Sequence, residues 1–188
     1  MTVMKKTICC LTLAVACVGV IVGCDSDEAP TTPPPAQPTA ESAAALPSNL
    51  FLAKAPEGAI ELAAAKKSVK PGDEIVVRGR VAGQMEPLAP NRAILTLLDG
   101  SVKTCDQMPG DSCKTPWDAC CEPRDLLQAN TATIQIVDAD GKPLKTTLRG
   151  ANGIEPLKEV TVVGKVKESG SANTLVIDAT GLYVKGSS

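Results

Sequence analysis

The sequence of 188 residues contains no histidine, and its only aromatic residues are Phe51, Trp117 and Tyr183. The absence of histidine removes the commonest general base, the histidine partner of serine and cysteine nucleophiles, and every histidine ligand for zinc. The shortage of aromatics removes most of the stacking platforms on which single-stranded nucleic acids bind. We therefore expect a protein that is not an enzyme, uses no cofactor and has no nucleic-acid partner.

The amino-terminal segment has the pattern of a secretory signal peptide. Lys5 and Lys6 precede an apolar run from Thr7 to Val22. At about 16 residues this run is shorter than the roughly 20 that a membrane-spanning helix needs. It ends in Ile21-Val22-Gly23-Cys24, which resembles the lipobox of bacterial lipoproteins. An ordinary soluble secretory signal is the alternative.

The lipobox resemblance implies that residues 1–23 are cleaved off and that the thiol of Cys24 carries lipid. Two or three acyl chains would anchor the protein to the cell membrane, facing the periplasm or another extracytoplasmic space. The formal charge of −2 becomes −4, because Lys5 and Lys6 leave with the signal peptide and no acidic residue does.

Residues 24–49 are rich in proline, alanine, threonine and serine, with three consecutive prolines at 33–35. Such a segment buries too little apolar area to offset its ordering entropy, and proline runs are extended. The sequence therefore predicts three parts: a signal peptide over 1–23, a lipid-anchored disordered tether over 24–49, and a folded domain over 50–188.

The folded domain begins with an ambiguous stretch and continues as strands. Helix-forming residues before Pro71-Gly72 predict a short helix or turn in which Ile60, Ala63, Ala64 and Lys67 share a face. Alternation with a period of two then predicts strands over 73–81, 92–98, 132–138, 159–167 and 174–185, with a return strand over 143–148. A short helix or loop is expected between the return strand and residue 159.

Five strands with glycines inside the first and fourth suggest a small closed barrel, since closure removes exposed edges. The stretches IELAAAKKSVKPGDEIVVRGRV (residues 60–81) and KEVTVVGKVKESGSANTLVIDATGLYVK (158–185) resemble the OB-fold domains of secreted bacterial proteins. The resemblance implies a mainly β fold with a five-stranded OB-like barrel. A β-sandwich is the competing architecture.

Four basic residues fall at alternating positions of the first and fourth predicted strands: Arg78, Arg80, Lys165 and Lys167. They are candidates for a basic stripe that binds single-stranded nucleic acid. The interpretation we favour is that they form the solvated outer face of a barrel, because period-two alternation places charged residues there.

The other chemical feature is a Cys-rich loop over residues 100–128, which contains Cys105, Cys113, Cys120 and Cys121. In an oxidising compartment an even number of cysteines predicts disulfides that staple the loop. Adjacent cysteines rarely bond to each other, because a vicinal disulfide strains the peptide unit between them. Two pairings stay open: Cys105 with Cys121 and Cys113 with Cys120, or Cys105 with Cys120 and Cys113 with Cys121.

A zinc or copper site built from the same four sulfurs is the alternative, although the spacing lacks the C-x-x-C knuckle of most all-cysteine zinc sites. Trp117 either covers the stapled loop or marks an exposed binding surface. The sequence thus predicts a tethered envelope lipoprotein that acts as a structural or binding module for an unknown protein or glycan. A metal-binding or thiol-redox lipoprotein is the alternative, followed by a single-stranded nucleic-acid-binding protein.

Overall fold

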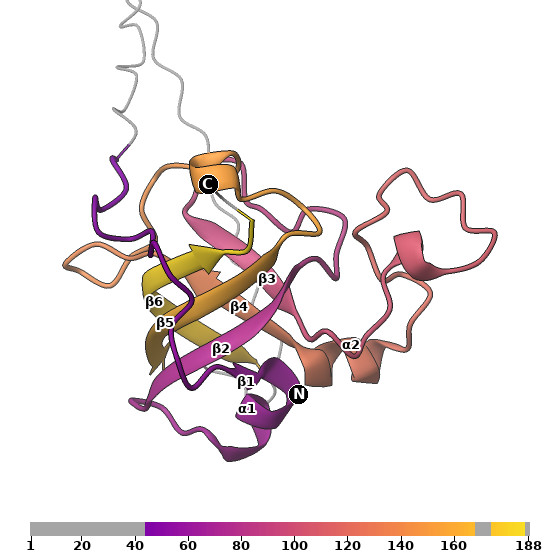
Figure 1. Cartoon of the computed structure of the whole chain (residues 1–188), viewed down its shortest axis with the longest axis horizontal. Helices are drawn as coiled ribbons and strands as arrows, with labels where there is room; N and C mark the ends of the chain where they lie inside the picture. Colours follow the sequence, from indigo (N-terminus) through magenta and orange to yellow (C-terminus); the bar gives the residue numbers. More distant parts are fainter. Residues whose placement is uncertain (1–43, 168–173, 187–188) are drawn as a thin grey trace, which may run out of the picture. The chain divides into compact units, whose positions relative to one another are not determined.

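The computed structural model describes residues 44–167 and 174–186 (Figure 1). The predicted signal peptide, Cys24 and most of the predicted tether lie outside the described residues. The description below therefore concerns the folded domain.

The domain is a closed five-stranded barrel with one short additional strand (Figure 1). The pairing order is β2-β3-β4-β6-β5, and β5 returns to pair with β2. The β4–β6 pairing is parallel and the other four pairings of the barrel are antiparallel. The strands are β1 (Ile60–Glu61), β2 (Glu74–Val81), β3 (Ile94–Leu98), β4 (Thr131–Gln135), β5 (Glu159–Lys167) and β6 (Leu175–Val184). The predicted mainly β, OB-like closed barrel is confirmed, and the β-sandwich is excluded.

The alternating residues of the strands form the core of the barrel as predicted. Ile75, Val77 and Val81 of β2 point inward and are buried. Val160, Val162 and Val166 of β5 do the same. Arg78 and Lys165 lie on the outer, exposed side of the same two strands. Burying one face of each strand therefore fixes the register of the sheet, because a slip by one residue would turn these valines outward.

Two glycines allow neighbouring strands to come close where the barrel bends. A Cβ at Gly79 of β2 would lie 2.6 Å from the carbonyl oxygen of Leu98 in β3. A Cβ at Gly164 of β5 would lie 2.5 Å from the carbonyl oxygen of Asp178 in β6, next to a register shift between Val163 and Gly164. Glycine at these two positions therefore permits the coiling that closes the sheet.

The prediction for the first helix was right in place and wrong in detail. The helix α1 (Leu62–Ser68) buries Leu62 and Ala65 rather than the predicted face. Ile60, expected on that face, is 41% exposed and belongs to β1, which pairs in parallel with β2. Pairing with the edge of the barrel has extended the chain up to Glu61, so the helix starts later and presents different side chains inward.

The predicted return strand over 143–148 does not form. A single bridge between Val137 and Pro143 replaces it, since proline lacks the N–H that a continuous ladder requires. A one-turn 3-10 helix, η2 (Ala151–Gly153), occupies the connection before β5. A second helix, α2 (Arg124–Asn130), was not predicted.

The folded part begins earlier than the predicted boundary after residue 49. The backbone N–H of Ala44 donates to Lys145, and Leu46 packs against the core. Leu50 is 1% exposed. Leu182 of β6 donates to the carbonyl of Leu50 and accepts from the N–H of Leu52. Residues 44–52 therefore cover the barrel beside β6.

Within the described ranges, no helix combines the length and the apolar character needed to cross a bilayer.

Candidate functional site

The long connection from β3 to β4, residues 99–130, is here named the cysteine insertion. It contains η1 (Cys105–Gln107) and α2, and it extends to one side of the barrel (Figure 1). Its base has its own apolar cluster, separate from the core of the barrel, in which Trp117 and Leu127 cover the buried residues Ala82, Leu98, Val102 and Ala119. The insertion is thus packed onto the barrel.

Asp99 fixes the start of the cysteine insertion. Its side chain is buried, and its Oδ2 accepts a 2.7 Å hydrogen bond from the backbone N–H of Ala63 in the first turn of α1. Its Oδ1 accepts from both the N–H and the hydroxyl of Ser101. Burial alone would raise the pKa of Asp99, but these hydrogen bonds outweigh burial and lower it. One carboxylate therefore joins α1, β3 and the insertion.

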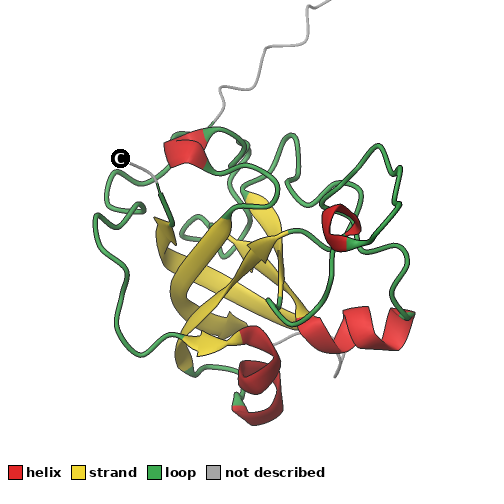
Figure 2. Ribbon diagram, turned by 45° about the vertical axis from the view of Figure 1, so that its right-hand side comes forward, coloured by secondary structure: helices red, strands yellow, loops and turns green. Residues whose placement is uncertain are grey.

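Lys66 fixes the carboxyl-terminal end of the cysteine insertion. Its ammonium group donates to the carbonyl of Gln128 at 2.5 Å and to that of Thr131 at 2.9 Å, where α2 ends. Burial lowers the pKa of Lys66. The helices α1 and α2 consequently lie side by side at one end of the barrel (Figure 2).

Arg80, one of the predicted basic residues, attaches η1 to the barrel. Its Nη1 donates to Thr104 Oγ1 at 3.0 Å and to Gln107 Oε1 at 3.1 Å, and its Nη2 lies 3.3 Å from Asp106 Oδ2. The side chain of Arg80 is 20% exposed. The Thr104 hydroxyl also donates to Asp106. These contacts fix the backbone on both sides of Cys105.

Trp117 attaches the far side of the insertion to the connection between β2 and β3. Its indole Nε1 donates to the carbonyl of Met85 at 3.0 Å, and its carbonyl accepts from Gly83 at 2.9 Å. The ring is half-buried over the insertion's apolar cluster. Trp117 is therefore partly buried against this cluster, between the two predicted alternatives of a covering and an exposed side chain.

Two backbone hydrogen bonds hold η1, which begins at Cys105, beside the segment that precedes Cys120. Cys105 N–H donates to the carbonyl of Asp118 at 2.8 Å, and Asp106 N–H donates to that of Pro116 at 2.9 Å. These bonds align η1 with the segment that leads directly into Cys120 and Cys121. The insertion therefore folds back on itself, so that Cys105 and Cys120, which are 15 residues apart, direct their sulfurs into one region.

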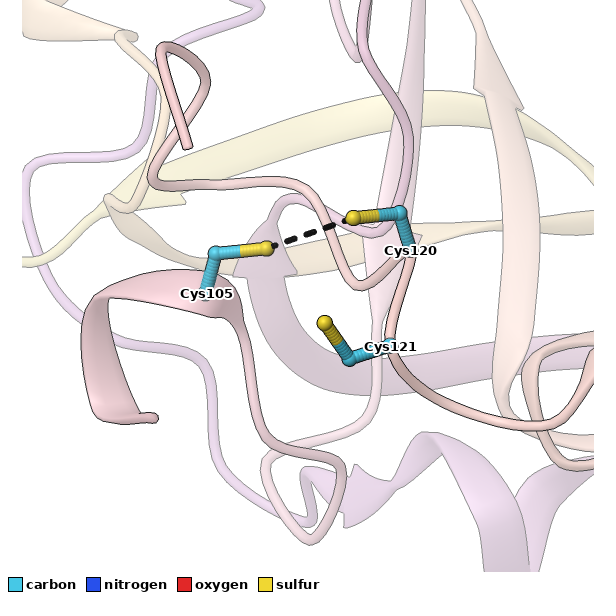
Figure 3. A group of neighbouring side chains, drawn as sticks. All are labelled: Cys105, Cys120 and Cys121. Carbon is cyan, nitrogen blue, oxygen red and sulfur yellow. Dashed lines mark hydrogen bonds between the residues drawn. The ribbon is translucent and has the colours of Figure 1, made fainter. Parts of the chain in front are cut away.

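The four sulfur atoms form a compact group. The Sγ of Cys120 lies 3.7 Å from that of Cys105 and 3.8 Å from that of Cys113. The sulfurs of Cys105, Cys120 and Cys121 all lie within 4.8 Å of one another, and they point toward a common space (Figure 3). A carboxylate oxygen of Asp111 lies within the same distance of the sulfurs of Cys105 and Cys113. Cys105 is buried, whereas Cys120 and Cys121 are exposed.

Neighbouring groups raise the pKa of three of these thiols, Cys105, Cys113 and Cys121. Burial raises the pKa of Cys105, and its contact with Cys120 adds to the rise. The Asp111 carboxylate raises the pKa of Cys113, and the contact with Cys120 raises the pKa of Cys121. A catalytic redox thiol needs the opposite shift, a pKa lowered by positive charge or a helix amino terminus. The direction of these three shifts is thus opposite to that of a catalytic redox thiol.

All four cysteines carry free thiols in this structure. The short distances include both pairs of the first pairing left open by the sequence, Cys105 with Cys121 and Cys113 with Cys120. Of the second pairing they include Cys105 with Cys120. The disulfides therefore stay a prediction.

The predicted basic stripe is divided into separate contacts. Arg78 forms an ion pair with Glu61 of β1, and Arg80 bonds to the insertion. Lys165 lies opposite Glu74 in the β2–β5 register. Lys167 donates to the carbonyl of Gly141. Each of the four thus lies beside an acidic or polar group. Arg78 and Arg80 line one pocket, but Glu61 and Glu159 line it with them.

Several residues of the site carry no strong mark in the sequence. Thr104, Asp106 and Asp111 lie among the polar residues of the Cys-rich loop, and Asp99 directly follows the predicted strand over 92–98. One signal was present: Thr104 and Gln107 have the spacing of a capping box, and Gln107 Oε1 accepts from the N–H of Thr104. That pattern marks a helical turn at Cys105.

A comparison with protein-family models, with curated protein sequences and with solved structures finds no match to this chain.

Proposed function

We propose that this chain is a membrane-tethered, extracytoplasmic lipoprotein that acts as a non-catalytic binding module, with the cysteine insertion as its binding surface. The pattern of residues 1–24 supports the tether and the compartment. The fold supports a module that presents a loop, because barrels of this kind hold their functional residues on loops fixed to a rigid frame.

The observation that carries the proposal is the attachment of the cysteine insertion at four separate places. Asp99 binds the start to α1, Lys66 binds the end of α2, Arg80 holds η1, and Trp117 holds the opposite side. An ordinary surface connection of this length carries much less support. Such rigidity lowers the entropy that ordering a loop costs on binding, as a recognition surface requires.

The nucleic-acid alternative receives less support from the charges. The acids beside Arg78, Arg80 and Lys165 compensate their charges locally, and the mature chain carries a formal charge of −4 after Lys5 and Lys6 are removed. Binding to single strands depends on an uncompensated basic groove and falls with salt. We expect fluorescence anisotropy to show no salt-dependent association with a single-stranded DNA oligonucleotide.

The tether is tested by metabolic labelling of the full chain, expressed in a bacterial host with a palmitate analogue. Wild type should incorporate the label and sediment with membranes. The Cys24→Ala variant should lose the label, whereas Cys17→Ala, a matched change inside the apolar run, should keep it. Label retained by Cys24→Ala, or absent from wild type, would contradict the lipoprotein assignment.

A further inference from the structure

We propose that the sulfurs of Cys105, Cys113, Cys120 and Cys121 form one binding site for a thiophilic d10 cation, Zn²⁺ or Cu⁺. This inference rests on the proposed function, because it names the ligand of the same binding surface. It assigns Cys105 as the central ligand of the site.

The first support is the spacing of the sulfurs. Zinc–thiolate bonds of about 2.3 Å in a tetrahedron place neighbouring sulfurs about 3.8 Å apart. The Cys105–Cys120 and Cys113–Cys120 sulfur pairs lie at 3.7 and 3.8 Å. A disulfide would hold one pair near 2.05 Å, by comparison. The two distances therefore match the spacing of ligands around one ion.

The second support is the way the sulfurs share neighbours. Cys105 has its sulfur within 4.8 Å of each of the other three, and Cys120 is almost equally close to Cys105 and Cys113. Disulfides form in exclusive pairs, so one short contact per sulfur would be expected of them. A central ion instead makes one ligand the neighbour of several others, as Cys105 and Cys120 are here.

The third support is the distribution of burial and charge around the group. Cys105 is 2% exposed, and hydrogen bonds from its own backbone to Asp118 and from Arg80 to Thr104 hold it in place. Cys120 and Cys121 are exposed, which leaves an entry path from solvent. The Asp111 carboxylate adds negative charge within reach of two of the sulfurs. The site thus combines a fixed ligand with open access for a cation.

The ligand types select a thiophilic ion. The chain has no histidine, and thiolate sulfur prefers zinc and monovalent copper over magnesium, calcium or manganese. Binding exchanges the thiol protons for the metal, with no change in the oxidation state of sulfur. Proton release on metal addition is therefore an expected accompaniment.

The test uses the full chain, purified from membranes in detergent under anaerobic, reducing conditions and stripped of metal with a chelator. Titration with Co²⁺ alone, as an optical probe for Zn²⁺, should give the intense visible absorption of tetrahedral thiolate coordination, saturating at one ion per chain. Added Zn²⁺ should abolish this absorption. A parallel titration with Cu⁺ against a competing copper chelator shows which of the two ions binds more tightly.

The variants Cys113→Ser and Cys121→Ser, at accessible positions, should lose the thiolate absorption while their circular dichroism stays that of wild type. Cys105→Ser should lose it as well, but this variant removes a buried group and must first be shown to fold. Ser112→Ala, next to Cys113, is the matched control and should bind like wild type. Binding unaffected by the cysteine changes would overturn the site.

Mass spectrometry of the exported, unreduced protein distinguishes the metal site from the disulfide staples. Bound metal with four free thiols supports the site. A deficit of four hydrogens without metal would overturn it and establish the disulfide staples instead. The palmitate experiment is independent: loss of labelling with retained metal binding would reject the tether alone, and the reverse result would reject the metal site alone.

Discussion

At Gly164 the absence of a side chain allows β5 and β6 to come close together. Its neighbours across the β5–β6 pair include a backbone carbonyl and Cγ2 of Ile177, which an added Cβ would approach to 2.8 Å. The backbone oxygen cannot move aside without breaking the ladder. Several other glycines of the domain, Gly100 among them, have nothing within 4 Å of an added Cβ, so composition alone does not reveal which glycine is needed.

We therefore expect Gly164→Ala to lower the free energy of unfolding by about 1–3 kcal/mol, the range typical of overpacking. Gly100→Ala is the matched control, because a Cβ at Gly100 meets nothing within 4 Å. That control should stay within about 0.5 kcal/mol of wild type. Urea denaturation followed by circular dichroism measures both, and equal stabilities would show that the two strands can separate to admit a methyl group.

The carboxylate of Asp99 should make the stability of the domain depend on pH. Its pKa is lowered in the folded state, so it contributes stability above its unfolded pKa of about 3.9 and loses that contribution as pH falls through the folded pKa. Asp99→Asn should destabilise the domain at pH 7 by about 1–3 kcal/mol, since a hydrogen-bonded buried group is disturbed. The difference from wild type should shrink when unfolding is measured below about pH 4. A difference that does not depend on pH would contradict the assignment.

At the scale of elements, η1 depends on Arg80 for its position. Arg78, two residues earlier on the same strand, forms only an exposed ion pair with Glu61, its side chain being 49% exposed. Exposed pairs contribute about 0–1 kcal/mol, and partly buried, multiply bonded guanidinium groups contribute more. The two arginines therefore form a natural pair of test and control.

We expect Arg80→Gln to accelerate hydrogen exchange at the amides of Cys105, Gln107 and Met108, each of which donates a backbone hydrogen bond in or beside η1. Exchange in β2 and β5 should change little. Arg78→Gln should leave the exchange of η1 at the wild-type rate. If both variants accelerate it equally, the guanidinium contacts of Arg80 do not hold the insertion.

The strands could be predicted because one face of each is buried in the core. Period-two alternation in β2 and β5 is a direct consequence of burial, and the predicted and observed spans differ by no more than one residue for these strands. The face of α1 could not be predicted in the same way. Its start depends on the pairing of β1 with β2, a contact between residues about 17 apart that leaves no local pattern.

The helix α2 could have been recognised. Pro123 precedes Arg124-Asp-Leu-Leu-Gln-Ala-Asn130, and proline is common at the start of helices whose next residues are good helix formers. The pattern was obscured by its position inside a loop rich in cysteine, proline and aspartate. The cysteines themselves were recognised as one site because they lie close together in the chain, whereas Arg80 and Asp99 act on it through distant contacts.

At the scale of the whole molecule, residues 44–52 decide where the domain can begin. A chain that starts at Ala44 retains Leu46, Leu50 and both backbone bonds between residues 50–52 and Leu182. A chain that starts at Ala53 loses all of them. Burial of one leucine side chain is worth about 1.5–3 kcal/mol, and each hydrogen bond adds about 0.5–1.5 kcal/mol.

We therefore expect the chain from Ala44 to unfold at the same urea concentration as the chain from Cys24. The chain from Ala53 should lose about 3 kcal/mol or more, on the same leucine and hydrogen-bond values. Thermal and urea unfolding of the three chains provide the measurement. Equal stability of all three would show that residues 44–52 only rest on the barrel.

The contacts between residues 50–52 and β6 also determine how the domain would respond to mechanical load. If Cys24 carries the lipid anchor that we propose, force enters from the amino-terminal side and reaches the Ala44–Lys145 hydrogen bond first, then Leu46, and then the two bonds to Leu182. These contacts would yield one after another before any strand of the barrel is pulled. The segment would thus act as a series of weak mechanical links that protects the barrel and its cysteine insertion from tension on the anchor.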